Sequence, residues 1–154
     1  MEKKFLEIIN RAITREEEAY LFYMNIHGKV EDPNVKDTIL WIAGEEKKHK
    51  EFLLNYRDGK YGAKPLRMTE VVLFKIAEYQ EEPEIARNMR SEDVYLVASH
   101  RELRSYQFYS ELAQIHPDGE AKDLLQKMAN EELRHKEKME YLYSNTAFAQ
   151  TSGG

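Results

Sequence analysis

The sequence contains no cysteine. Its absence excludes disulfides, thiolate metal sites, iron–sulfur clusters and catalysis by a thiol. The chain also lacks an apolar run long enough to cross a membrane, and its first residues, MEKKFLEIINRAITREEE, carry charges throughout instead of a signal-type apolar core. We therefore expect a cytoplasmic protein with no membrane contact.

Positive charge is also in short supply. The chain has 23 Lys and Arg residues against 28 Asp and Glu residues, a net charge of −5 at pH 7. A general nucleic-acid binder normally shows a basic face or a high pI, so we expect no nucleic-acid partner. With 154 residues the chain has the size of one domain and is long enough to bury a core.

Glycine and proline are scarce in four long stretches and concentrated between them, which predicts an all-α protein. The four expected helices cover Lys3–His27, Pro33–Tyr56, the segment from an N-cap at Ser91 to His116, and Asp118–Tyr143. The long connection over 57–90 can cross a bundle, and MTEVVLFKIAEY within it predicts a short helix capped by Thr69. We expect residues 1–145 to form one four-helix bundle, followed by a loosely ordered tail over 146–154.

The chain repeats itself. The segment AGEEKKHKEF, residues 43–52, matches ANEELRHKEK, residues 129–138, at an offset of 86 residues as measured from Glu46 to Glu132. The same offset, without insertion, matches further residues of the first and third expected helices and of the segments between: Arg15 with Arg101, Glu16 with Glu102, Tyr20 with Tyr106, Phe22-Tyr23 with Phe108-Tyr109, and Lys36-Asp37 with Lys122-Asp123. Two copies of a helical hairpin about a pseudo-twofold axis would build a four-helix bundle, and a site on that axis would be inherited in duplicate.

Helical spacing decides which repeated polar residues share a face. Positions three and four apart lie together, so Glu46 projects with His49, and Glu132 projects with His135. In the first helix Glu16 interrupts a stripe of apolar residues, and its repeat partner Glu102 does the same in the third. The acids next to Glu16, at 17 and 18, repeat as leucine and arginine, so only Glu16 is acidic in both copies.

Four carboxylates and two imidazoles are thus expected to face one bundle core. A buried, unpaired carboxylate costs several kcal/mol, so four of them would unfold the domain. Two divalent cations balance four negative charges. Mixed oxygen and nitrogen donors suit iron or manganese, with redox-silent zinc as a third candidate. One Glu from each of two helices plus Glu-x-x-His from each of the other two is the ligand set of ferritin-like di-iron and di-manganese proteins.

On these residues the sequence resembles the ferritin-like superfamily, and most closely a rubrerythrin-type domain, over nearly the whole chain apart from the connection and the tail. The resemblance implies two iron ions bridged by Glu46 and Glu132. It implies one terminal histidine and one terminal carboxylate per ion, supplied by His49 and His135 and by Glu16 and Glu102.

A second layer of residues is implied less directly. Tyr23 and Tyr109 resemble tyrosines that hydrogen-bond to ligand carboxylates in rubrerythrins, although ordinary core tyrosines fit the same pattern. Glu45 and Glu131 are candidates to accept the outer N–H of a ligand histidine, with a plain solvated glutamate as the alternative. The remaining histidines lack symmetric partners and are interpreted as structural: His27, His100 and His116.

The resemblance implies that the protein reduces hydrogen peroxide or O2 at the di-iron centre. Without cysteine the chain has no rubredoxin iron site, so electrons must come from a separate donor such as a rubredoxin. Rubrerythrins often carry an extra glutamate one turn after a terminal ligand, whereas the corresponding residues here are Ala19 and Ser105. That difference puts a rubrerythrin-like peroxidase cycle in doubt and leaves a six-ligand site closer to that of bacterioferritin.

Three other functions remain open. A ferroxidase that stores iron has the same ligands, but a ferritin cage usually needs a fifth helix, for which the segment after His135 is short. No haem is expected, because Lys47 stands where a bacterioferritin haem needs methionine. An oxygenase acting on an organic substrate and a helical adaptor with a structural metal are the other two.

We expect a homodimer, with exchange of hairpins between chains as one way to form it.

Overall fold

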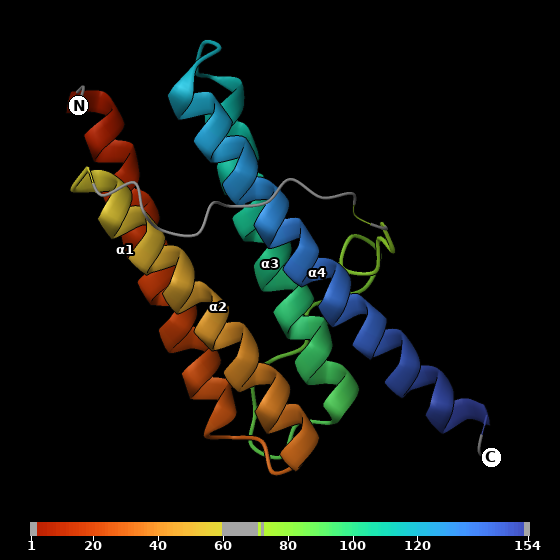
Figure 1. Ribbon diagram of the computed structural model, residues 1–154. Helices are drawn as coiled ribbons and strands as arrows, with labels where there is room; N and C mark the ends of the chain where they lie inside the picture. Colours follow the sequence, from red (N-terminus) through yellow and green to blue (C-terminus); the bar gives the residue numbers. More distant parts are fainter. Residues whose placement is uncertain (1–2, 60–70, 72, 153–154) are drawn as a thin grey trace. The chain divides into compact units, whose positions relative to one another are not determined.

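The computed structural model describes residues 3–59, 71 and 73–152, the last five of these as backbone only. It contains four helices and, within the described residues, no strand. The helices are α1 (Lys3–His27), α2 (Pro33–Arg57), α3 (Ser91–Gln114) and α4 (Glu120–Ser152). They belong to two compact units, Met1–Pro65 and Leu66–Gly154, each built around one helical hairpin (Figure 1). None of the described helices offers a stretch long and apolar enough to span a membrane. A single domain over residues 1–145 is still a prediction.

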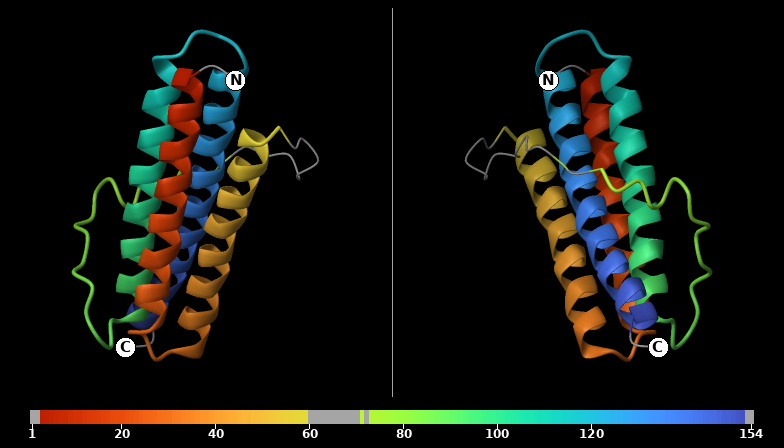
Figure 2. Two further views of the ribbon diagram at one scale, coloured as in Figure 1. Left: turned by 90° about the vertical axis from the view of Figure 1, so that its left-hand side faces the viewer. Right: turned by 90° about the vertical axis from the view of Figure 1, so that its right-hand side faces the viewer.

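The N-terminal hairpin is the one that the sequence predicts most closely. α1 begins and ends at the expected residues, and α2 begins at Pro33 as expected and runs one residue past Tyr56. Asp32 is the N-cap of α2: its carboxylate accepts hydrogen bonds from the backbone N–H groups of Asn34 and Val35, at 2.8 and 3.4 Å. These two bonds satisfy helix N–H groups that have no partner within the helix. α1 and α2 lie side by side and antiparallel (Figures 1 and 2).

The C-terminal hairpin pairs α3 with α4, and its turn differs from the prediction at both sides. α3 ends at Gln114 instead of His116, because the residue before Pro117 is disfavoured in a helix. α4 begins at Glu120 instead of Asp118, since Gly119 has φ 152° and lies outside the helix. At the other end of α3 the N-cap is Arg90, without a side-chain cap, so the prediction of Ser91 as the cap is wrong by one residue.

α4 is longer than the sequence predicts. It was expected to end at Tyr143 with a loose tail from 146, but it continues to Ser152, so the backbone over 146–152 is helical. The segment SNTAFAQTS contains neither glycine nor proline, and Thr146 Oγ1 bonds back to the carbonyl of Leu142 at 2.8 Å. The predicted end was therefore wrong because nothing in these residues breaks a helix.

The short helix predicted in the connection is not found in its described part. Residues 73–76 have no regular structure and 77–79 form a turn, while Thr69, its expected cap, lies outside the described residues. Lys75 has φ 55°, a left-handed conformation that interrupts a right-handed helix. Within the described part of this predicted helix a single turn closes, through hydrogen bonds from Tyr79 N and Gln80 N to Ile76 O at 3.1 and 3.0 Å.

A buried ionic network ties this connection to α4. Glu140 is fully buried and accepts hydrogen bonds from the backbone N–H groups of Ile76 and Ala77, at 3.2 and 3.0 Å. Lys136, which is 3% exposed, lies 2.7 Å from Glu140 and 2.8 Å from Glu78. The two carboxylates compensate the buried ammonium, and the connection is thereby held beside the helices of its own unit (Figure 2).

Candidate metal centre

Three acidic and imidazole side chains meet in the N-terminal unit. Glu16 lies on α1, and Glu46 and His49 lie one turn apart on α2. One ligand atom from each of the three lies within 4.8 Å of those of the other two. His49 Nδ1 is 3.7 Å from Glu16 Oε1. The antiparallel packing of α1 and α2 thus places Glu16, the expected terminal carboxylate, beside the expected Glu-x-x-His pair.

The C-terminal unit holds the same arrangement. Glu102 lies on α3, and Glu132 and His135 lie one turn apart on α4. Their ligand atoms also lie within 4.8 Å of one another. His135 Nδ1 is 3.8 Å from Glu102 Oε2, nearly the separation found in the first unit. Each hairpin therefore carries two carboxylates and one imidazole in matching positions.

All six of these side chains are buried, none with more than 4% of its surface exposed. Within each triad the carboxylates outnumber the single imidazole, so negative charge is in excess even when the imidazole is protonated. The separations of 3.7 and 3.8 Å between the imidazole Nδ1 and a carboxylate oxygen are those of an ion pair and exceed the length of a hydrogen bond between these two atoms. A cation is the partner that compensates such buried negative charge most directly.

The distances fit ligands of one metal ion. Imidazole nitrogen and carboxylate oxygen bind zinc at about 2.0–2.2 Å, so two ligands of one ion lie at most about 4.4 Å apart. The separations of 3.7 and 3.8 Å fall below that limit. Oxygen and nitrogen donors without thiolate suit iron or manganese and also accept zinc. The donor set of each unit therefore fits a metal ion.

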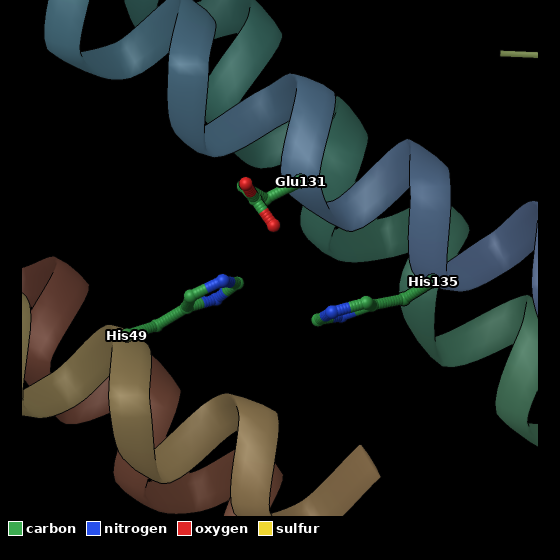
Figure 3. A group of neighbouring side chains, drawn as sticks. All are labelled: His49, Glu131 and His135. Carbon is green, nitrogen blue, oxygen red and sulfur yellow. The ribbon is translucent and has the colours of Figure 1, made fainter. Parts of the chain in front are cut away.

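The glutamates next to the Glu-x-x-His segments differ between the units, which the repeat does not predict. Figure 3 shows Glu131 and His135 on α4, and His49 on α2. Glu131 is 8% exposed, and one of its oxygens lies within 4.8 Å of a ring nitrogen of His135. Both glutamates pair with the basic residue one turn further on, Glu131 with Arg134 at 3.4 Å and Glu45 with Lys48 at 3.5 Å, but the Glu131 side chain is 10% exposed and the Glu45 side chain 21%. Glu131 is thus an additional candidate metal ligand beside His135, whereas the more exposed Glu45 fits the alternative of a solvated glutamate.

The two predicted tyrosines are buried and equivalent. Tyr23 and Tyr109 are 0% and 1% exposed, and each meets the preceding phenylalanine edge to face, with centroids 5.3 and 5.2 Å apart. The repeat therefore preserves the packing of both rings. Their predicted hydrogen bonds to ligand carboxylates stay predictions.

The positions where rubrerythrins often carry an extra glutamate are filled by small buried residues. Ala19 is 2% exposed and Ser105 is 6% exposed. Neither offers a carboxylate, so the ligand count stays at three per unit unless Glu131 takes part.

The other histidines lie outside the candidate ligand clusters among the described residues. His116 Nδ1 lies 2.6 Å from the carbonyl oxygen of Leu112, to which only a protonated nitrogen can donate. This bond supports the end of α3, in agreement with the structural interpretation of His116.

Comparison with known proteins agrees with this geometry. A family model described as Rubrerythrin matches residues 7–143, a range that includes both triads. A solved structure of a hypothetical protein from Pyrococcus furiosus has the same fold, with a TM-score of 0.59 and 24% identity over 91% of this chain and 88% of that chain. No curated protein sequence matches significantly. The predicted fold class, an all-α protein of the ferritin-like four-helix type, is confirmed.

Proposed function

The chain belongs to the rubrerythrin family, and on that premise we propose that it is a non-haem di-iron oxidoreductase that reduces hydrogen peroxide or O2. The observation that carries the proposal is the duplication of one buried ligand triad, with imidazole-to-carboxylate distances of 3.7 and 3.8 Å in the two hairpins. A lone triad would fit a structural ion. Two equal triads supply the four carboxylates and two imidazoles of a di-metal centre.

Each ligand has a role in this proposal. Glu46 and Glu132 would bridge the two ions, and each ion would be held by one imidazole and one terminal carboxylate from the remaining candidate ligands, His49, His135, Glu16 and Glu102. The four carboxylates balance the charge of two divalent ions. A bound pair of ferrous ions would supply two electrons, which with two protons convert hydrogen peroxide to two water molecules.

The protein's own contribution is positioning and exclusion of water. Apolar core residues such as Ile9, Ile42 and Met128 are buried in the same units as the candidate ligands. They exclude water from the surroundings of these ligands. Tyr23 and Tyr109 hold the ligand carboxylates through their hydroxyl groups, which act as donors. Electrons return from a separate donor protein, since the chain has no cysteine with which to bind a rubredoxin iron.

The test is anaerobic loading of the apo-protein with Fe²⁺, followed by stopped-flow mixing with hydrogen peroxide and, separately, with O2. We expect about two irons per chain, oxidised faster by peroxide than by O2 and reduced again by a rubredoxin. Iron that is not retained stoichiometrically, or that reacts with neither oxidant, would contradict the proposal.

Ferroxidase activity with iron storage is the second candidate, and one observation favours it. The buried small residues Ala19 and Ser105 leave the six-ligand set without the extra glutamate frequent in rubrerythrins. In this function Fe²⁺ is the substrate. The same experiment separates the two: storage predicts many irons consumed with O2 and retained by the protein, instead of two that cycle.

A further inference from the structure

The face of α2 opposite the ligands carries an unusual stripe of residues. Asp37, Trp41, Gly44 and Lys48 follow one another at spacings of four, three and four, so they line one side of the helix. The buried ligands Glu46 and His49 lie on the other side. Trp41 keeps 37% of its surface exposed, and the Lys48 side chain is 74% exposed. Beside them Leu40 is 50% exposed.

The internal repeat shows that the fold does not require this apolar character. The corresponding residues of α4 are polar throughout: Asp123, Lys127, Asn130 and Arg134. The two ends of the stripe keep the sign of their charge in both helices, whereas the central pair is lysine and asparagine in α4 but Trp41 and Gly44 in α2. Leu40 likewise corresponds to a glutamine, as does the exposed Leu21 of α1. The N-terminal hairpin thus has an apolar outer face that its twin lacks.

Gly44 is not explained by packing within the chain. A Cβ atom added to it would meet no atom of the described residues within 4 Å, so none of these residues excludes a larger side chain. Glycine is also the poorest helix former after proline. A glycine in the middle of a helix, one turn from an exposed tryptophan, leaves a shallow notch beside a large ring.

We propose that α2 is the docking surface for α2 of a second copy of this chain, packed antiparallel about a twofold axis between residues 42 and 43. In that register Trp41 of each copy packs into the notch at Gly44 of the other. Asp37 then lies opposite Lys48 in both directions. The contact is isologous, as a closed dimer requires, and Leu40 and Leu21 flank it.

Charge complementarity selects a second copy in this orientation. The stripe is acidic at one end and basic at the other, 11 residues apart, or roughly 16 Å along a helix. An antiparallel copy places opposite charges together at both ends, whereas a parallel copy places like charges together. The proposal is independent of the metal chemistry.

Trp41 is the only tryptophan of the chain, so its fluorescence reports on this surface directly. Sedimentation equilibrium of the full-length protein should show a dimer, and the emission of Trp41 should shift to the red on dilution. Trp41→Lys, which introduces the residue of the repeat, should weaken dimerisation by at least about 30-fold, as expected for a central aromatic contact. The matched control Lys127→Ala, on the equivalent face of α4, should leave it unchanged. A wild-type chain that stays monomeric, or a Trp41→Lys variant that dimerises like the wild type, would overturn the proposal.

A charge exchange tests the register even if the tryptophan variant fails to fold. Asp37→Lys and Lys48→Asp should each weaken the homodimer by about 10-fold, because each places like charges opposite each other twice. An equimolar mixture of the two variants should form heterodimers with every pair restored, and the double variant should regain wild-type affinity. If neither substitution changes the dimerisation affinity, the chains pair through another docking surface or by exchange of hairpins, and the proposal is contradicted.

Discussion

The two hairpins match in the residues of the helix faces that carry the candidate ligands, and they differ in the residues of the opposite faces. Each buries two glutamates and one histidine at the same spacings, with the imidazole 3.7 or 3.8 Å from the glutamate of the neighbouring helix. Outside these positions the copies diverge: the exposed Trp41 corresponds to Lys127, and the buried Glu140 corresponds to Leu54. The six candidate ligands have one geometry in both copies, whereas the residues of each opposite face are constrained only by the groups that contact that face.

The largest expected effect tests whether the two triads are equivalent. Glu46→Gln and Glu132→Gln should each lower the metal content to one ion per chain or less, because a neutral amide cannot replace a bridging carboxylate. Metal counting after dialysis measures this. Glu17→Gln is the matched control: Glu17 is 42% exposed, pairs with Lys50 at 2.7 Å, and should not alter the content. Equal content in all three variants would show that the register is wrong.

The next effect compares two lysines at the same position of the repeat. Lys136 is 3% exposed and lies between Glu78 and Glu140, whereas Lys50 is 32% exposed and pairs with Glu17. Lys136→Met should lower the free energy of unfolding by about 3–5 kcal/mol, since it leaves Glu140 buried without its cation. Lys50→Met should cost less than about 1 kcal/mol. Denaturant unfolding of the apo-proteins measures both, and similar losses would contradict the structural difference.

A smaller effect concerns the first turns of α2 and α4. Asp32 caps α2 through two backbone N–H groups, but its counterpart Asp118 is fully exposed and lies 3.5 Å from Lys122 instead. Asp32→Ala should therefore cost about 1 kcal/mol of unfolding free energy. Asp118→Ala should cost less than about 0.5 kcal/mol, as for ordinary surface positions. If both variants lose the same amount, the cap is not what distinguishes these turns.

The smallest effect has the opposite sign. Gly44→Ala should raise the free energy of unfolding by about 0.8–1 kcal/mol at concentrations where the chain is monomeric. Alanine is the better helix former, and the added methyl group meets no described atom within 4 Å. The same variant should weaken the dimer, since its methyl group fills the notch proposed for Trp41. Asn130→Ala on α4 is the control, for which no change in dimerisation is expected. A Gly44→Ala chain that gains no stability would show that its surroundings are less open.

Much of this protein is determined by the sequence alone. The α1 boundaries, the start of α2 with its Asp32 cap and the all-α class follow from helix spacing and from scarce glycine and proline, which act locally. The ligand candidates follow from the repeat, because only a residue retained in both copies separates Glu16 from the acids beside it. The rubrerythrin family model matches residues 7–143, a range that contains all of these candidates.

Other features were decided by tertiary structure. The sequence treats Glu45 and Glu131 alike, yet of the two only Glu131 is buried. The sequence also predicts a short helix over MTEVVLFKIAEY, residues 68–79, but in the described part of that segment Lys75 is left-handed and Glu140 binds the backbone of Ile76. Glu140 itself, at a position where the repeat has leucine, gives no signal in the sequence that it is buried. Local patterns set helix positions, but burial of a charge depends on which distant groups compensate it. Only the folded chain brings the N–H groups of Ile76 and Ala77, and the ammonium of Lys136, to that carboxylate.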